Sequence, residues 1–490
     1  MIIEYIFAVL VAASMITFFT GGRSRQFARL TSLAIAAAVI IYSAYRFYPG
    51  YDGGYISTFS LTLSSYTGFY FSLGINGFTD LLVVLGSIIV LAALFISDRS
   101  DDPVYYGLIL LTEVGIFGLL MSTDLFFFYV FWEVVLIPVY FLIGLYGGPR
   151  KDSVSLKFLV YTHIGSVFIL LSIFTLYSYY YSEFGILTMQ NADLLSTPFF
   201  ATIPYFYKVF ILTGFLIGFL VKLPTFPLHS WLPDSYEEAP YPVTVILAGA
   251  LSVMGGFGLF GILYPLYSQI PSFFLWLLIA LGILSLIYFS FTAMFQSNIK
   301  RMMAYASAAS MGFVSIAFGS GILGTGNNGI IDLAGGMFQI FAHGLIVAFL
   351  FSLLYYIKTH TGHDTFYGLG GIYRESPVMA TLFLGGLLAS LGLPGLAGFV
   401  AEFSIIAGSY GILGPLIYLV IFSMIITASY HIWAAQKALY GPYNENLGQV
   451  RDLSRSESAA MIFMLISILV IGLFPRIVFP LLTGYLGGIA

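Results

Sequence analysis

Cysteine is absent from this chain of 490 residues. Its absence excludes disulfides, thiolate zinc sites, iron–sulfur ligation and cysteine nucleophiles on this polypeptide. Charge is scarce as well, because only 8% of the residues are Asp, Glu, Lys or Arg, whereas soluble proteins carry about 25%. The net charge is only -4 and the basic residues are scattered, which gives no support to nucleic-acid binding. Water is therefore not expected to be the main solvent of this protein.

Apolar residues take the place of the missing charge. They make up 59% of the sequence, and the mean hydropathy is +0.97. A bilayer core requires about 20 apolar residues per helix, and many runs of that length are present. The N-terminus carries Glu4 instead of a basic region and has no A-x-A-like cleavage site, so we expect a retained first helix rather than a signal peptide. The sequence predicts an all-α integral membrane protein with about fourteen transmembrane helices.

Two of the predicted helices are interrupted. The seventh contains Lys222-Leu-Pro-Thr-Phe-Pro227 and the twelfth contains Gly392-Leu-Pro-Gly395. Proline removes a helix hydrogen bond, and a broken backbone is tolerated in a membrane only where protein or a wet cavity satisfies it. Paired interruptions in the two halves of a transporter indicate its ion path. The fourteen predicted helices span residues 2–20, 28–47, 79–97, 104–122, 125–147, 156–181, 206–232, 243–264, 271–295, 302–323, 331–357, 377–410, 412–436 and 458–484.

The basic residues predict the orientation of these helices. Of the 18 Lys and Arg residues, 14 flank odd-numbered connections, 3 flank even-numbered ones, and Lys222 lies within a helix. By the positive-inside rule, the odd connections are cytoplasmic and both termini extracytoplasmic. The odd-side residues are Arg23, Arg25, Arg29, Arg99, Arg150, Lys151, Lys157, Lys300, Arg301, Lys358, Arg374, Lys437, Arg451 and Arg455, and the even-side residues are Arg46, Lys208 and Arg476.

A few ionisable residues lie inside the predicted helices. Glu113, Glu133, Lys222 and Glu402 are the isolated charges of their runs, and His343 is the single ionisable residue between Asp332 and Lys358. A charge at a helix centre costs about 2.5–3.5 kcal/mol on insertion scales. Four such groups facing lipid would cost on the order of 10 kcal/mol, so we expect them to face the bundle interior. Acid, amine, imidazole and bound water together form a path along which protons can hop.

Structural roles are the alternatives at each position. Glu113 can be a carboxylate bonded to a neighbouring hydroxyl, His343 can donate to a helix carbonyl, and Glu133 with Lys222 can form a structural ion pair. His163 and His431 lie near predicted cytoplasmic helix ends, which indicates interfacial side chains. The pair His360 and His363 lacks the carboxylates of a metal site, and no glycine-rich segment forms a phosphate loop.

Several motifs, in order, resemble the M-type antiporter-like subunit of complex I. They are Asp124 to Gly144, Lys157-Phe-Leu-Val-Tyr161, Val221-Lys-Leu-Pro224 with His229-Ser-Trp-Leu-Pro-Asp234, Glu238-Ala-Pro240 with Ile246-Leu-Ala-Gly249, Ile299-Lys-Arg301, Met337 to Gly344, and Gly392-Leu-Pro-Gly395 with Phe399 to Phe403. The resemblance covers about residues 74 to 440. The wider family includes subunits of multisubunit sodium–proton exchangers, membrane-bound hydrogenases and coenzyme F420 dehydrogenases.

The resemblance assigns roles to these residues. It implies that Glu133 and Lys222 are the acid–lysine pair, Glu113 a further acid of the fourth helix, His343 a relay histidine, and Glu402 the terminal acid that is Glu in the M-type and Lys in other types. His229, Ser310 and Lys157 are further candidates for the proton path. Two positions depart from the family. Val253 stands where the eighth helix usually has a lysine, and Ser310 stands where the tenth usually has a histidine.

The resemblance also implies the architecture and the assembly. It implies N-terminal helices in 1–103, two inverted five-helix repeats in 104–264 and 265–440, and a last helix in 441–490. It implies a proton-translocating subunit of an NADH (or related donor):quinone oxidoreductase, with other membrane and peripheral subunits, including antiporter-like neighbours, around it. Quinone and redox cofactors would then be on partner subunits, with no cofactor or metal on this chain. A subunit of a sodium–proton antiporter and a non-conducting scaffold subunit remain the alternatives.

Overall fold

The chain is a multi-pass, all-α membrane protein. The computed structural model describes residues 2–46, 56–64, 66–98, 101–447 and 450–489. Within these ranges twelve helices are long and apolar enough to cross a membrane, and two shorter apolar helices accompany them. Each of the fourteen predicted segments contains a helix, so the prediction of the fold class is confirmed. Arg99, one of the residues counted in the charge bias, lies outside the described residues.

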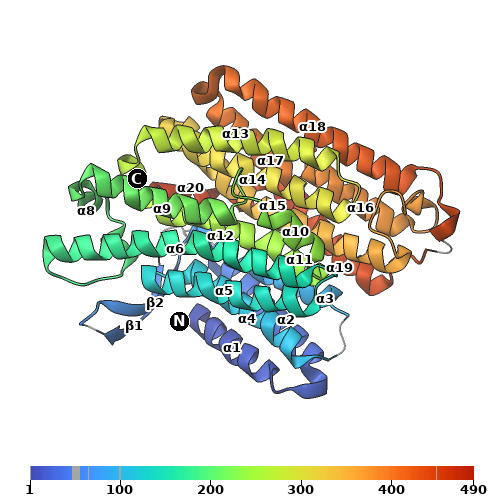
Figure 1. The fold of residues 1–490 in the computed structure, drawn as a ribbon, viewed down its shortest axis with the longest axis horizontal. Coiled ribbons are helices and arrows are strands. Elements are labelled where there is room, and N and C mark those ends of the chain that lie inside the picture. The colour runs from blue at the N-terminus through green and yellow to red at the C-terminus, as the bar shows by residue number, and fades with distance from the viewer. Residues whose placement is uncertain (1, 47–55, 65, 99–100, 448–449, 490) are drawn as a thin grey trace. The chain divides into compact units, whose positions relative to one another are not determined.

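The helices follow one another with short connections (Figure 1). The helices in the fourteen predicted segments are α1 (Ile2–Thr17), α2 (Ser24–Arg46), α3 (Gly77–Ile96), α4 (Pro103–Met121), α5 (Leu125–Tyr146), α6 (Lys151–Phe184), α9 (Tyr205–Lys222), α11 (Tyr241–Ile246) continuing through a π-helical stretch into α12 (Ser252–Phe257), α13 (Ser272–Met294), α14 (Ile299–Leu323), α15 (Gly326–Thr361), α16 (Pro377–Ser390), α17 (Ala397–Leu413), α18 (Ile417–Ala435) and α19 (Arg455–Leu473). Shorter helices are α7 (Asn191–Leu194), α8 (Thr197–Thr202), α10 (Trp231–Glu238) and α20 (Phe479–Ile489).

Both predicted helix interruptions are present. α9 ends at Lys222, and eight residues of irregular backbone separate it from α10. α16 ends at Ser390, and α17 begins at Ala397 after Gly392 and Gly395, whose φ angles are +78° and +94°. Left-handed backbone of this kind is readily adopted only by glycine. Proline at the first break and glycine at the second are therefore the local causes of the two interruptions.

Two parts of the chain differ from the sequence prediction. The predicted connection 48–78 contains an antiparallel hairpin of β1 (Ile56–Ser64) and β2 (Phe69–Ile75), with Leu61 opposite Phe71. Apolar and small polar residues alternate there, a pattern that favours strands, whereas residues 47–55 of that connection lie outside the described ranges. The predicted last helix, 458–484, is wrong as a single element, because α19 ends at Leu473 and a turn at Pro475–Ile477 precedes α20.

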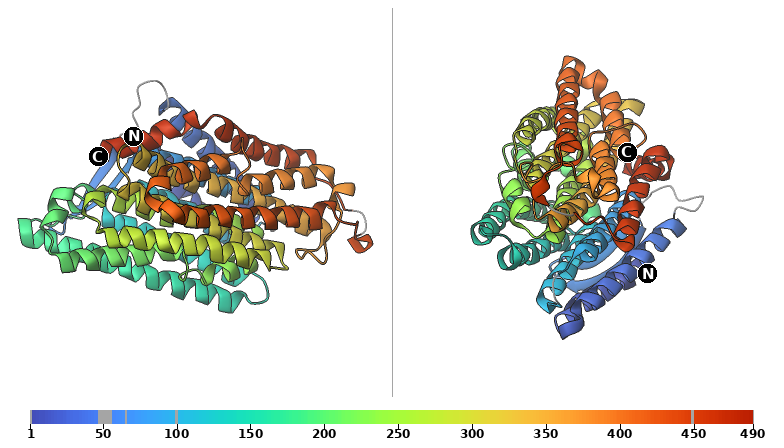
Figure 2. Two further views of the ribbon diagram at one scale, coloured as in Figure 1. Left: turned by 90° about the horizontal axis from the view of Figure 1, so that it is seen from above. Right: turned by 90° about the vertical axis from the view of Figure 1, so that its right-hand side faces the viewer.

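The described contacts divide the chain into two compact units. The first unit contains residues 1–224, 250–274 and 480–490, and the second contains 225–249 and 275–479. Within each unit the long helices run alongside one another, as two further views show (Figure 2). In the second unit α15 packs against both α14 and α17. That packing places the middle of α15 among other helices, away from lipid.

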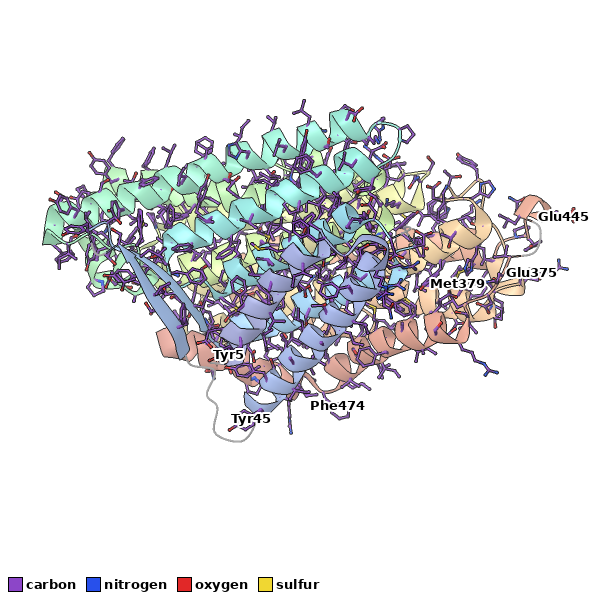
Figure 3. All side chains as sticks on the ribbon, turned by 90° about the horizontal axis from the view of Figure 1, so that it is seen from below. Tyr5, Tyr45, Glu375, Met379, Glu445 and Phe474 are labelled. Carbon is purple, nitrogen blue, oxygen red and sulfur yellow. The ribbon has the colours of Figure 1, made fainter. Side chains whose placement is uncertain are left out.

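The outer surface of the helices is apolar. Side chains such as Tyr45 (75% exposed) and Phe474 (60% exposed) point away from the ribbon (Figure 3). Exposed apolar surface on this scale is not found on soluble monomers, and it fits contact with acyl chains. Small and polar residues gather where helices approach one another. For example, a Cβ at Gly282 or Gly312 would meet the backbone of the other at under 3 Å.

Candidate functional site

Lys222 ends α9 at the first helix break and is enclosed within the first unit, with 1% of its side chain exposed. Its Nζ donates to the carbonyl oxygen of Trp132 at 3.3 Å, lies 4.2 Å from the centre of the Trp132 ring, and is 3.9 Å from Sδ of Met254. Among the described residues, Lys222 forms no ion pair with a carboxylate. A lysine held by a carbonyl and a ring face has no salt bridge to break when it releases its proton.

Glu133 lies on α5 and contacts a histidine that the sequence analysis assigned to the interface. Nδ1 of His163 is 3.1 Å from Oε2 of Glu133. The Glu133 side chain is 21% exposed and that of His163 is 54% exposed, so this pair is less enclosed than we expected. The described contacts thus give the predicted acid–lysine pair separate partners, His163 for Glu133 and Trp132 for Lys222.

α6 is longer than predicted. The helix begins at Lys151 rather than at residue 156. His163 lies twelve residues, or about 18 Å, along the helix, where it contacts Glu133 of α5. Helix boundaries are the least certain part of a sequence prediction.

Glu113, in the middle of α4, is fully buried. Neither of its carboxylate oxygens has a hydrogen-bond partner within the part of the chain that the structure describes. A buried polar group without a partner is costly, and it fits either a neutral carboxylic acid or one bound to water. The structural interpretation, a carboxylate bonded to a neighbouring hydroxyl, is not what the described contacts show.

His343 lies in the middle of α15 and is 5% exposed. Its Nε2 is 3.0 Å from Oγ of Ser307 on α14, a residue that the sequence analysis did not select. Oγ of Ser310 instead donates to the carbonyl of Ala306 in its own helix, while the carbonyl of Ser310 accepts a bond of 3.4 Å from Nε2 of Gln339. The hydroxyl that contacts the histidine thus lies one turn before Ser310 on α14.

Glu402 lies in the second turn of α17, just after the second break, and is 5% exposed. It faces a cavity of about 10 Å³ that Ser310, Phe313, Leu391 and Thr427 also line. A space of about this size holds one water molecule. Glu402 and Ser310 therefore face the same small space, which a water can bridge.

The backbone at Gly392 shapes the surroundings of Glu402. A Cβ at Gly392 would lie 2.6 Å from Oε2 of Glu402, and its φ is +78°. We expect Gly392→Ala to lower the stability of the complex by on the order of 1–3 kcal/mol, measured as a lower midpoint in a thermal unfolding scan. Gly411→Ala on α17 is the matched control, because a Cβ there meets nothing within 4 Å. Equal midpoints for the two variants would contradict this account.

The remaining candidates lie elsewhere. His229 packs against the rings of Phe226, Tyr288 and Phe289 in the second unit, with centroid distances of 5.8, 5.4 and 4.6 Å. Lys157 is partly exposed on α6.

Two further buried groups lie near the ends of predicted helices. Lys300 is 4% exposed, donates to the carbonyl of Glu237 at 3.1 Å and lies 4.2 Å from the centre of the Tyr241 ring. His431 was expected at the interface but is 1% exposed, with Nδ1 2.8 Å from the carbonyl of Thr427. Their positions depend on neighbouring helices, which a single sequence does not reveal.

Asp124 caps α5 just outside the membrane-spanning segments. Its carboxylate accepts from the backbone N–H groups of Phe126 at 2.9 Å and Phe127 at 3.2 Å. Burial nevertheless raises the pKa of Asp124 to about 7, against the lowering effect of these bonds. Because this pKa is raised, any stability that Asp124 adds in its neutral form is lost as pH rises through about 7.

The described residues contain no group of three or more His, Cys, Asp or Glu side chains that could hold a metal ion. The titratable side chains of the candidate site are isolated acids, an amine and imidazoles, each enclosed by apolar or hydroxyl side chains. Groups of this kind exchange protons through hydrogen bonds and water.

Comparisons with known proteins place the chain in a family. Residues 122–427 match the family model described as "NADH:quinone oxidoreductase/Mrp antiporter, TM". Subunit M of the F420H2 dehydrogenase of Methanosarcina mazei is 35% identical over 422 residues, which cover 85% of this chain and 83% of that protein. Subunit M of the NADH-quinone oxidoreductase of Rickettsia felis is 34% identical over 416 residues, covering 83% and 80%. A chain of respiratory complex I from Thermus thermophilus superposes with a TM-score of 0.82 and 26% identity, covering 98% of this chain and 100% of that one.

Proposed function

Because the chain belongs to the NADH:quinone oxidoreductase/Mrp antiporter transmembrane family, we propose that it is the M-type, proton-translocating membrane subunit of a complex I-like oxidoreductase. Its relatives at 34–35% identity are subunits M of an NADH-quinone oxidoreductase and of an F420H2 dehydrogenase. In this proposal, partner subunits carry the quinone site and the redox cofactors. NADH and reduced coenzyme F420 are the candidate electron donors.

One observation carries the proposal. Each of the two helix breaks has an enclosed titratable group beside it, Lys222 at the first and Glu402 at the second. A broken helix frees backbone groups that need polar partners or water, and an enclosed charge needs the same surroundings. At two positions in an otherwise apolar protein, the sequence therefore puts a titratable group beside backbone groups that need polar partners or water. A scaffold subunit has no need of this combination.

The proposed mechanism is electrostatic. A charge change in a neighbouring subunit alters the state of Glu133, and the altered charge of Glu133 biases Lys222. Lys222 then releases its proton, and the charge passes on to His343 and Glu402. Val253, where the family usually has a lysine, is 2% exposed and carries no proton, so water must cover that step. Glu113, buried on α4, is the further acid of the first unit.

The proposal extends to topology and domains. The charge bias of 14 to 3 basic residues supports cytoplasmic odd-numbered connections and extracytoplasmic termini. We assign residues 104–264 and 265–440 to the two antiporter-like repeats, 1–103 to the N-terminal helices and 441–490 to the C-terminal segment. The proposed partners are membrane and peripheral subunits, including antiporter-like neighbours. They would cover exposed apolar faces such as that of α18, which carries Tyr418 and Ile425.

The test is coupled ion transport by the purified complex in liposomes. We expect NADH or reduced F420, with a soluble quinone analogue, to drive proton uptake that quenches an acridine dye in sodium-free buffer. Glu133→Gln should lower the ratio of protons to electrons, because Gln keeps the shape but not the charge. Glu183→Gln, at an exposed position on α6, is the matched control. Transport of ²²Na⁺ in place of protons would favour an antiporter subunit, and a full ratio for Glu133→Gln would leave only a scaffold role.

A further inference from the structure

A buried carboxylate near the outer end of α15 has no part in the mechanism above. Asp332 is the seventh residue of α15 and is fully buried. The charge bias predicts that this end of the helix is extracytoplasmic. Ser320 on α14 lies 2.6 Å from Oδ2 of Asp332, and Oδ1 has no partner among the described residues. On α14, α15 and α17 the acidic side chains are Asp332 and Glu402 alone.

The hydroxyl of Ser320 suits both protonation states of Asp332. Its Oγ lies 2.6 Å from Oδ2 of Asp332 and 2.6 Å from the carbonyl oxygen of Ile316. A hydroxyl has one hydrogen and can also accept a bond. When Asp332 is ionised, Ser320 donates to the carboxylate. When Asp332 is protonated, its O–H donates to Ser320, which then donates to Ile316.

A polar seam between α14 and α15 leads from the middle of the unit to Asp332. The contacts are His343 with Ser307, Gln339 with the carbonyl of Ser310, and Asp332 with Ser320. On α15, Asp332, Gln339 and His343 are spaced by seven and four residues, which places them on one helix face. Gln339 is 3% exposed, and its Oε1 has no partner in the described part of the chain.

α17 connects Glu402 to the same place. Gly408 of α17 packs against Asp332, because a Cβ at Gly408 would lie 2.6 Å from Cβ of Asp332. Gly408 is six residues, or about 9 Å, beyond Glu402 along the helix. Ser409 lies seven residues beyond Glu402 and so on the same face. It is fully buried, and its Oγ has no partner within the described residues. A hydroxyl therefore lies at about the level of Asp332 on the face of α17 that carries Glu402.

We propose that Asp332 is the outer proton-exchange group of the second unit, which takes protons from Glu402 and passes them to extracytoplasmic water. This proposal rests on the proposed function. In each transfer the O–H bond of the Glu402 carboxylic acid breaks, water and the Ser409 hydroxyl relay one proton, and the Asp332 carboxylate gains it. Rotation of the Ser320 hydroxyl accommodates the new state. Loss of the proton to outer water returns Asp332 to the carboxylate, and no electrons move.

The decisive variants are Asp332→Asn and Asp332→Glu in the whole complex, reconstituted as above. An Asp with a structural role tolerates Asn, which keeps the shape and the bond to Ser320, better than the longer Glu. A relay residue shows the opposite order. We expect Asp332→Asn to lower the number of protons moved per electron by at least about tenfold, and Asp332→Glu to keep most of it. The assembled complex should be recovered in equal amount for both.

A matched serine pair supplies the control. Ser320→Ala removes the hydroxyl that contacts Asp332, whereas Ser352→Ala removes a buried hydroxyl of α15 that bonds only to the carbonyl of Ala348. We expect a lower ratio of protons to electrons for Ser320→Ala alone. Asp332→Asn at the wild-type ratio, while Glu133→Gln lowers it, would overturn this proposal and leave the proposed function intact. If neither variant changes the ratio, the proposed function fails, and this proposal fails with it.

Discussion

Replacing Lys222 by Met is expected to stop proton translocation while the complex still assembles. Met is similar in length to Lys and can pack its sulfur against the Trp132 ring, which the ammonium now faces at 4.2 Å. Because Lys222 has no contacting carboxylate in the described structure, its removal leaves no buried anion unpaired. We expect protons moved per electron to fall by at least about tenfold, with the thermal midpoint unchanged or higher.

A second substitution separates charge from proton release. Lys222→Arg keeps the positive charge, but guanidinium does not deprotonate in proteins. If Lys222 must give up its proton, Arg fails as completely as Met does. If a fixed positive charge is enough, Arg retains translocation and the relay role of Lys222 is wrong. Lys208→Met, near the start of the same helix, is the control, because Lys208 bonds to Ala201 and Gln269 away from the break.

The helix breaks and the enclosed acids were predictable because their causes are local. Pro224 and Gly392 act on the backbone within a few residues of themselves, and one charge in a run of twenty apolar residues must avoid lipid wherever the helix packs. The positions of Lys222, Glu113 and Glu402 followed from these two facts. Neither fact depends on which helices are neighbours.

The partners of these residues were not predictable, because they depend on the register between helices. His343 meets Ser307 of α14. His163 meets Glu133 of α5. The spacing of these residues in the sequence indicates neither contact. Asp332 looked like a residue at a helix end, although α15 extends six residues beyond it. Sequence periodicity gives the face of a residue but not what lies against it.

The largest effect in the second unit is expected for Glu402→Gln. The substitution keeps the size of the side chain and the cavity of about 10 Å³ beside it, but it removes the only acidic side chain of α17. The cavity has room for one water that would join Glu402 to the Ser310 side. An amide at position 402 can hold such a water but cannot release a proton. We expect at least about a tenfold loss of protons moved per electron, with the quinone-reduction rate in uncoupled membranes kept.

Two further variants decide between charge, shape and proton exchange at this position. Glu402→Asp keeps the carboxylate but withdraws it by one methylene from the cavity. We expect part of the proton translocation to remain, because a second water can fill the added space. Glu375→Gln, at an exposed position (Figure 3), should leave the ratio unchanged. Full translocation by Glu402→Gln would show that protons bypass α17.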